Sequence, residues 1–343
     1  MRIDLEETVR QHPILRKARE RLSLRMIVQL LTAVMLLVAA RHFAEFVSYV
    51  RTGSGVAPVR PPVAEGFLPI AAILAFKAFL ATRIIDPIHP AGLVIFIATV
   101  TTAWAFRRAL CSWICPIGTF SEYLGKLGKK LMGRELTLPR WLDIGLLSLK
   151  YIFALLVFTL FFTLSGRQVY EFMRQPFYAV SDVKMFDMFT HLSAAGLVVI
   201  LAIVVFSVFV KSFWCRYLCP YGAFLGVLGL LSPITLHKEE STCIGCMKCN
   251  QVCPNKVNVR DKNGVVFSPE CTGCTSCVKA CPNKGTLELK LLGLVTLRPI
   301  YFSLAFLGVF FGIILWAQLT GHWVTGLTLQ SYRYLDRVAS AGF

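Results

Sequence analysis

The chain has 343 residues, of which 56% are hydrophobic and only 16% charged, and its mean hydropathy is +0.63. A soluble domain of this length needs a more polar surface, so the composition indicates an integral membrane protein and excludes an ordinary soluble enzyme. The net charge of +17 gathers at the ends of apolar runs. The positive-inside rule accounts for that placement, and no nucleic acid is expected as a partner.

Five apolar segments are long enough to cross a bilayer, namely residues 26–47, 90–106, 144–164, 194–210 and 300–319. A sixth, residues 66–85, carries Lys77 and Arg83 and is broken by Pro69. We expect it to be a re-entrant or interfacial helix on the outer face. The basic N-terminal tail and the basic stretch after Phe106 then lie on one side, which the positive-inside rule makes cytoplasmic.

Two copies of a CxxxCP motif follow the second and fourth predicted spans. CSWICPIGTFSEYLG begins at Cys111 and CRYLCPYGAFLGVLG at Cys215, and seven aligned positions are identical. Both copies enter the membrane in the same sense, which predicts two parallel halves related by an axis along the membrane normal. If the segments are helical, cysteines four residues apart share a face, and the proline kinks or ends the helix just past the second cysteine.

Two such faces would bring four thiols together at the inner rim of the membrane. We therefore expect an additional redox or metal site formed by Cys111, Cys115, Cys215 and Cys219. The alternative is that these small side chains only pack between helices, as free cysteine commonly does.

The segment between the fourth and fifth spans holds two longer cysteine runs. CIGCMKCNQVCP and CTGCTSCVKACP both have the spacing C-x2-C-x2-C-x3-C-P. In bacterial ferredoxins with this pattern, the fourth cysteine of each run ligates the other cluster. The first [4Fe-4S] cluster is therefore predicted on Cys243, Cys246, Cys249 and Cys281, and the second on Cys253, Cys271, Cys274 and Cys277. A pair of zinc sites is the alternative, but zinc usually takes two C-x2-C pairs.

These segments predict a mostly α fold: a polytopic membrane helix bundle of about five spans plus one re-entrant or interfacial helix, with two parallel pseudo-repeats and an inserted ferredoxin-like α+β domain. The expected domains are a cytoplasmic tail (1–25), a membrane domain with the twin motifs (26–236), a cytoplasmic domain with two [4Fe-4S] clusters (237–290), and a final span with a periplasmic tail (291–343). All 12 cysteines then fall on the reducing side, where metal ligation is commoner than disulfides.

Electrons from an inner ferredoxin domain cannot cross a hydrocarbon core of about 30 Å in one step. The CxxxCP site, a quinone or a haem on a partner would have to relay them. His89 and His191 lie near the outer ends of two predicted spans and are candidates for contact with a quinone or haem, with His42 a third. A purely structural role is the commoner alternative. Lys150 and Arg298, near span ends, are expected to reach the lipid headgroups.

The twin CxxxCP motifs followed by a two-cluster ferredoxin domain resemble the NapH/NosR group of membrane-bound 4Fe-4S ferredoxins. The stretches LPRWLDI from Leu138, DVKMFD from Asp182 and WCRYLCPYG from Trp214 are more similar still to the YccM-like electron-transport proteins. The resemblance covers nearly the whole chain. It implies electron transfer between a quinol pool or cytoplasmic donor and a periplasmic reductase or cytochrome. The outer flavin-binding domain of NosR and the large extension of the assembly-factor relatives have no counterpart, so their activities are not expected.

The leading hypothesis is a multi-pass protein of the bacterial inner membrane, with the N-terminus and ferredoxin domain cytoplasmic and the C-terminus periplasmic. It would contact lipid and redox partner proteins and pass single electrons as a subunit of an oxidoreductase system rather than as a stand-alone enzyme. One alternative is an assembly or maturation factor whose CxxxCP thiols reduce or deliver metal to a respiratory metalloenzyme. Another, ranked lower because no output domain is visible, is a redox-sensing membrane regulator.

Overall fold

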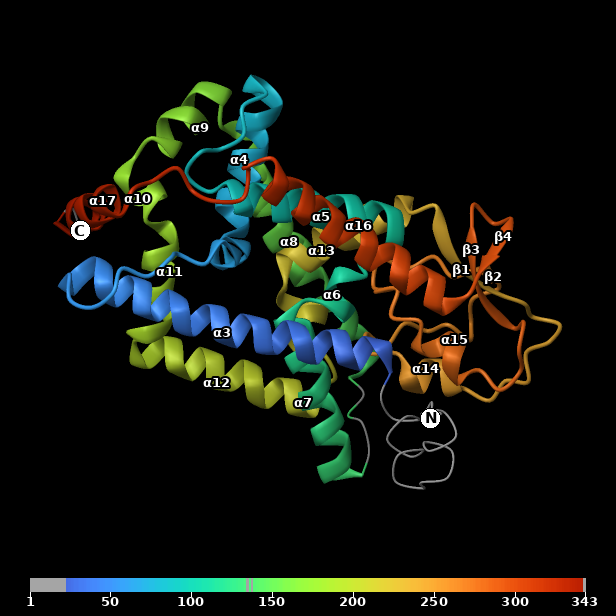
Figure 1. The fold of residues 1–343 in the computed structure, drawn as a ribbon. Coiled ribbons are helices and arrows are strands. Elements are labelled where there is room, and N and C mark those ends of the chain that lie inside the picture. Colours follow the sequence, from blue (N-terminus) through green and yellow to red (C-terminus); the bar gives the residue numbers. More distant parts are fainter. Residues whose placement is uncertain (1–22, 134–135, 137, 342–343) are drawn as a thin grey trace, which may run out of the picture.

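The structure, a computed structural model, describes residues 23–133, 136 and 138–341, so the predicted tail lies almost entirely outside the described residues. Its membrane part is built from α3 (Leu24–Thr52), α4 (Pro69–Thr82), α5 (Pro90–Phe106), α8 (Arg140–Thr163), α12 (Ala194–Phe209) and α16 (Pro299–Leu319). Figure 1 shows a group of short helices near the C-terminus at one end and a small β-sheet at the other, with α3 and α16 running toward the sheet and α12 ending beside α7.

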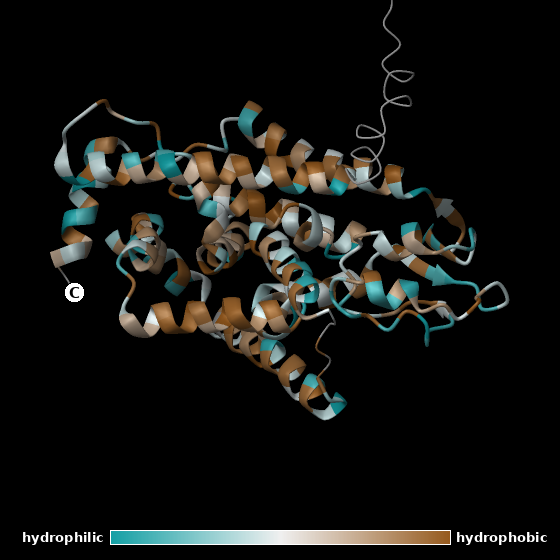
Figure 2. Ribbon diagram, turned by 90° about the horizontal axis from the view of Figure 1, so that it is seen from below, coloured by the Kyte–Doolittle hydropathy of each residue, from teal (hydrophilic) through white to brown (hydrophobic). Residues whose placement is uncertain are grey.

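The long helices expose apolar side chains. Leu37 on α3 is 72% exposed and Phe162 on α8 is 76% exposed. In Figure 2 the long helices are mostly brown, the colour of hydrophobic residues. By length and composition, α3, α8 and α16 can each cross a membrane. They correspond to the first, third and fifth predicted spans. The fourth, α12, qualifies only together with α11 (Ser181–Thr190), from which it is bent by 80°. The chain is therefore a membrane protein, with three to four candidate spans among the residues that the structure describes.

The second predicted span has the expected bounds but an unexpected environment. Helix α5 has 17 residues and packs against α4, α16 and α13 (Pro220–Leu228). Ala91, Leu93, Ala98 and Ala103 on it are fully buried. Small side chains along α5 let the neighbouring helices approach closely. Helix α5 is therefore the central helix of the bundle, and by length it falls among the shorter apolar helices.

The sixth apolar segment folds as α4, a helix of 14 residues. A helix of that length is about 21 Å long, which is shorter than a hydrocarbon core of about 30 Å. Lys77 donates hydrogen bonds to the carbonyl groups of Phe161 and Leu164 at the end of α8. The charge within this apolar helix therefore lies against backbone acceptors instead of lipid.

Short helices cover the end of the bundle farthest from the sheet: η1 (Pro62–Phe67), α9 (Gly166–Met173), α10 (Pro176–Ala179), α11 and α17 (Leu329–Ala341). A buried ion network joins η1, α11 and α17. Arg60 Nη1 lies 2.5 Å from Glu65 Oε1 and its Nε 2.7 Å from Asp182 Oδ2. Tyr332 on α17 donates to the same Asp182 carboxylate at 3.3 Å. These contacts tie the segment after α8 to the C-terminal helix.

The two CxxxCP repeats pack reciprocally. The first comprises α5, α6 (Leu110–Trp113) and α7 (Pro116–Met132), and the second comprises α12, η2 (Trp214–Leu218), α13 and η3 (Gly229–Leu231). Helix α7 packs on α12, and α13 packs on α5. A Cβ added at Gly125 would lie 3.3 Å from Lys211 Cα, and one added at the aligned Gly229 would lie 3.3 Å from Arg107 Cα. In each repeat, this glycine therefore allows close approach to the backbone of the other repeat.

The small sheet follows η3 directly. Its strands are β1 (Ile234–Lys238), β2 (Gly264–Val265), β3 (Leu287–Leu291) and β4 (Val295–Leu297), in the antiparallel order β2-β1-β3-β4. Ile234 pairs with Leu291, and Lys238 pairs with Leu287. Two short helices, α14 (Lys248–Val252) and α15 (Ser276–Ala280), accompany it. The sheet thus covers residues 234–297, a little more than the predicted domain of 237–290.

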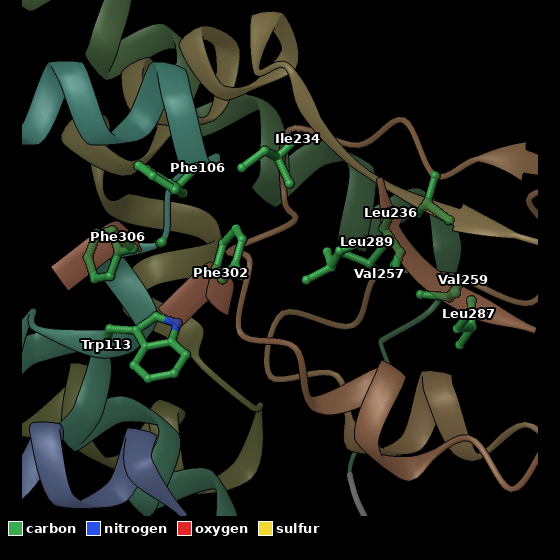
Figure 3. Packing of buried hydrophobic residues seen from close by; sticks show 12 residues of the cluster. Phe106, Trp113, Ile234, Leu236, Val257, Val259, Leu287, Leu289, Phe302 and Phe306 are labelled. Carbon is green, nitrogen blue, oxygen red and sulfur yellow. The ribbon is translucent and has the colours of Figure 1, made fainter. Parts of the chain in front are cut away.

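The core of this small domain continues into the membrane helices. Leu236, Val257, Val259, Val266, Leu287 and Leu289 form one buried cluster with Phe106, Trp113, Phe302 and Phe306. Figure 3 shows these aromatic side chains on one side of the sheet residues. A sheet of this size buries little apolar surface alone. The ferredoxin-like segment is therefore built onto α5, α6 and α16.

We predict that Gly128→Ala loosens the packing of α7 on α12, because the added methyl group would overlap the carbonyl oxygen of Val208. Overpacking of this kind typically lowers the free energy of unfolding by about 1–3 kcal/mol. Gly145→Ala on α8 is the matched control, since nothing lies within 4 Å of its added Cβ. Thermal unfolding of both variants in the same detergent measures the difference. Equal stability would contradict close contact between α7 and α12.

Candidate iron–sulfur sites

One cavity lies at the end of the ferredoxin-like segment that faces away from the membrane helices. Its lining includes Cys243, Cys246, Cys249 and Cys281. Three of these come from the first run and one from the second, as in the predicted set. Cys246 is exposed, and the neighbouring Ile244 is 69% exposed. This outer cavity is therefore accessible from the surface of the protein.

A second cavity lies between the sheet and the membrane helices. Its lining includes Cys253, Cys271, Cys274 and Cys277, again the predicted set of three plus one. Arg107, after α5, and Phe302, on α16, complete the lining on the membrane side. Val257, Val266 and Leu289 close it with apolar side chains. Arg107, Val266 and Phe302 in this lining are all buried, whereas Ile244 in the outer cavity is exposed.

Both cysteine runs follow the same backbone path. Gly245 and Gly273 have φ of 71° and 57°, and the residues after the second cysteines, Met247 and Thr275, have φ of 62° and 60°. These left-handed positions turn the chain tightly enough for three sulfurs to converge. A Cβ at Gly273 would also lie 3.0 Å from both Phe106 O and Phe302 Cζ. Glycine is needed there for packing as well as for the turn.

The donor set suits iron–sulfur ligation. Burial raises the pKa of Cys253 to about 12 and that of Cys277 well above its ordinary value. Cys253 Sγ also accepts a hydrogen bond from Val257 N at 3.3 Å. Because iron binds thiolates, the ligands must lose these protons when a cluster is loaded, and the fold supplies backbone N–H groups to the resulting negative charge.

Each CxxxCP motif forms a short helical segment that ends before the proline, and a new helix begins at the proline. Of the two outcomes expected, a kink or an end, the helix ends. In the first copy Cys115 N bonds to Leu110 O, and in the second Cys219 N bonds to Trp214 O, five residues back in each case. Each motif therefore ends in a wide π-type turn. Cys115 and Cys219 are the N-caps of α7 and α13, and the prolines open those helices. Proline lacks an N–H and fits the first helical position, which explains why it starts a helix instead of kinking one.

The four thiols of these motifs lie together. Cys111 interacts electrostatically with Cys115 and Cys219, and Cys215 interacts with all three. All four are half-buried and none forms a disulfide. Burial raises the pKa of Cys111 to about 12, although Arg108 opposes that rise. In the described part of the chain, no group of three or more His, Cys, Asp or Glu side chains is close enough to hold a single metal ion.

The three candidate histidines occupy different surroundings. His89 is buried, with Nδ1 3.2 Å from Arg60 Nη2 and Nε2 2.8 Å from the carbonyl oxygen of Tyr178. Both ring nitrogens therefore have protein partners. His191 ends α11 and is 76% exposed, while His42 lies exposed on α3 beside Glu45. Ser181, at the other end of α11, contacts His89. About 15 Å of helix therefore separates His89 from His191.

Buried charges beside the CxxxCP motifs were missed by the sequence prediction. Lys150 is fully buried and pairs with Glu270, so its predicted position at the headgroups is wrong. Arg108 is 1% exposed and donates to Gly222 O at 2.9 Å and Glu270 Oε2 at 2.7 Å. Burial raises the pKa of Glu270, but Arg108 and Lys150 outweigh this and hold it below its usual range. The sequence signal for these charges was their position beside motif cysteines: Arg108 lies three residues before Cys111, and Glu270 directly precedes Cys271.

Arg107 is also buried, but its partners are backbone carbonyl groups. Its guanidinium donates to the carbonyl groups of Ile234, Val266 and Ser268 in the ferredoxin-like segment. Arg107 and Arg108 therefore join two parts of the fold and are buried against protein partners.

Comparison with known proteins matches these segments to iron–sulfur families. A family described as a 4Fe-4S binding domain matches residues 88–135 and 192–238, which hold the two CxxxCP motifs. A 4Fe-4S dicluster domain matches residues 235–282, which hold both long runs. No solved structure matches the chain.

Similar proteins cover much of the sequence. YccM of Escherichia coli K12, named as an electron transport protein, is 37% identical over 314 residues, which are 90% of this chain and 88% of YccM. The ferredoxin-type protein NapH of the same organism is 29% identical over 46% of this chain and 51% of NapH. The regulatory protein NosR of Stutzerimonas stutzeri is 28% identical over 49% of this chain and 22% of NosR. The chain belongs to the family of 4Fe-4S ferredoxin-type electron-transport proteins.

Proposed function

We propose that the chain is a membrane-bound electron-transfer protein with two [4Fe-4S] clusters in exchanged ligand sets. Cys243, Cys246, Cys249 and Cys281 would hold one, and Cys253, Cys271, Cys274 and Cys277 the other. The observation that carries this proposal is that each cavity is lined by three cysteines of one run and the fourth of the other. The family matches over residues 235–282 support the same chemistry.

When bound, a [4Fe-4S] cluster takes up and releases one electron without making or breaking bonds to a substrate. In each transfer the donor loses one electron and the acceptor gains one. The polypeptide holds the sulfurs, keeps water from the inner cavity and presents the outer cavity at the surface. The donor is proposed to be a quinol pool or a cytoplasmic protein, and the acceptor a periplasmic or respiratory redox partner. A quinone has no assigned site.

The inner cavity is joined to the CxxxCP motifs by direct contacts. Ser112 Oγ donates to Thr272 O at 3.0 Å, and Trp113 Nε1 donates to Gly273 O at 3.4 Å. Arg25 at the start of α3 donates to Ser112 O and to Ser276 Oγ, at 3.0 Å each. These contacts support a route from the ferredoxin-like segment to an additional redox centre at Cys111, Cys115, Cys215 and Cys219.

The proposed orientation places the ferredoxin-like segment in the cytoplasm and the C-terminus in the periplasm, with the chain in the bacterial inner membrane. The basic residues that flank the apolar helices on the sheet side support it. The reciprocal contacts of Gly125 with Lys211 and of Gly229 with Arg107 support two parallel repeats. A role in maturation of a respiratory metalloenzyme is the second candidate, favoured by four cysteines that are close together and form no disulfide.

Paired cysteine substitutions test the exchanged ligand sets. We predict that Cys243→Ser with Cys281→Ser removes one cluster, because both residues line the outer cavity, and lowers iron by about four atoms per chain. The matched pair, Cys243→Ser with Cys253→Ser, should damage both clusters and lower iron by about eight. Iron and sulfide analysis of anaerobically purified protein measures this, with EPR of the reduced state as a second readout. The reverse order of losses would assign each cluster to a single run.

Reporter fusions test the orientation. Alkaline phosphatase is active only in an oxidising compartment, since its disulfides must form. We predict activity for a fusion at the C-terminus and none for an insertion at Asn263, an exposed residue between the cysteine runs. A cytoplasmic fluorescent reporter at both sites is the complementary control. Phosphatase activity at Asn263 would place the clusters in the periplasm and overturn the proposed direction across the membrane.

A further inference from the structure

We propose that Cys111, Cys115, Cys215 and Cys219 together hold one further [4Fe-4S] cluster, and that the guanidinium of Arg108 is its counter-cation. The inference rests on the proposed function and deepens it: the additional redox centre becomes an anionic cluster shared between the two repeats. Each repeat supplies only two cysteines, so neither can provide the four ligands of a cubane alone.

The two motifs present their sulfurs in the same way. Cys219 Sγ accepts a hydrogen bond from Gly222 N at 3.2 Å, and the Cys115 sulfur has equivalent backbone partners at Ile117 and Gly118. The N-termini of α7 and α13, with 17 and nine residues, therefore face one sulfur each. Helix N-termini favour thiolate over thiol because their unpaired N–H groups carry partial positive charge.

The charges around these sulfurs do not balance without an anion. Arg108 and Lys150 are both buried, and both pair with the single carboxylate of Glu270. The nearby Arg216 is already paired with Asp143 at 2.7 Å. One positive charge is left over in a buried environment, and buried charges are normally paired. A four-thiolate cluster with a net negative charge supplies the missing partner.

Arg108 is placed to act on that charge. A point at the Cβ position of Gly222 lies 3.5 Å from Arg108 Nη1 and 3.5 Å from Cys219 Sγ, so these atoms flank the same small space. Arg108 also interacts electrostatically with Cys111 and Cys215. Its Nε is buried and has no hydrogen-bond partner in the described residues. An acceptor in the site is therefore missing from the protein itself.

A [4Fe-4S] cluster fits these four cysteines better than a single metal ion or a pair of disulfides does. The sulfurs are not close enough for a single metal ion, judged over the described residues, whereas a cubane has larger ligand spacing. The cysteines that line the outer and inner cavities are likewise too far apart to hold a single metal ion. A pair of disulfides would be neutral and would leave the excess charge of Arg108 and Lys150 uncompensated.

Iron stoichiometry tests the cluster in the full-length protein, purified anaerobically. We expect about twelve iron and twelve sulfide atoms per chain, against about eight if only the ferredoxin-like segment is loaded. Cys111→Ser with Cys115→Ser should lose about four irons, and so should Cys215→Ser with Cys219→Ser, because the motifs share one cluster. In both variants the EPR signal of the ferredoxin-like pair should remain. Retention of about twelve irons by either variant would overturn the inference.

The outcomes separate this inference from the proposed function. A wild-type count of about eight with an interacting EPR pair leaves the electron-transfer proposal standing and removes the shared cluster. One zinc per chain in place of the extra iron also removes it. Protein free of iron and sulfide contradicts both proposals. If the cysteine variants fail to accumulate, the wild-type count decides on its own.

Redox titration followed by EPR tests Arg108. Reduction adds negative charge, so Arg108→Gln should lower the midpoint potential of the additional cluster, while the ferredoxin-like pair changes little. Arg108→Lys keeps the charge and should stay near the wild-type value. Arg167→Gln, in an exposed pair with Glu171 far from the site, is the control. No selective shift in Arg108→Gln, or a lowered potential in Arg108→Lys, would contradict the role of counter-cation.

Discussion

Glu270 holds the functional end of this molecule together. Its carboxylate, next to the candidate ligand Cys271, pairs with Arg108 of the first repeat and Lys150 of α8. Arg108 also donates a hydrogen bond to Gly222 of the second repeat. One buried anion thus connects the ferredoxin-like segment, both CxxxCP repeats and a lipid-exposed helix. Removing one member of such a set leaves an unpaired buried charge, which typically costs about 3–5 kcal/mol. The relative positions of the candidate redox sites depend on this interaction.

The shared apolar core also fixes the ferredoxin-like segment relative to the membrane helices. The sheet of the ferredoxin-like segment packs on Phe106, Trp113, Phe302 and Phe306, which belong to α5, α6 and α16. A small domain on a flexible linker would sample many distances from the membrane. Here the inner cavity is lined by residues of both parts. Fixed spacing suits electron transfer, because its rate falls steeply with the distance between centres.

Glycine residues allow the two repeats to pack closely against each other. Gly125 and Gly229 let each repeat approach the chain of the other just before its cysteine motif, and Gly128 does so along α12. In membrane helices such small residues replace the hydrophobic effect as the source of close association. Close approach of the repeats is what places cysteines 104 positions apart in sequence beside one another.

The sequence by itself determined the chemistry of the ferredoxin-like segment, because short loops of defined spacing confine their sulfurs whatever surrounds them. It also determined the helices that carry long apolar runs, whose bounds the structure shifts by only a few residues. Tertiary structure alone decided the role of isolated charges. Lys150 and Arg108 suit lipid headgroups or cytoplasm as well as a buried partner, and Glu270 lies 120 residues or more along the chain from both. Likewise, α5 could be recognised as the centre of the bundle only once its neighbours were in place. Local pattern specifies backbone and ligand spacing, whereas burial of a charge depends on what the fold brings opposite it.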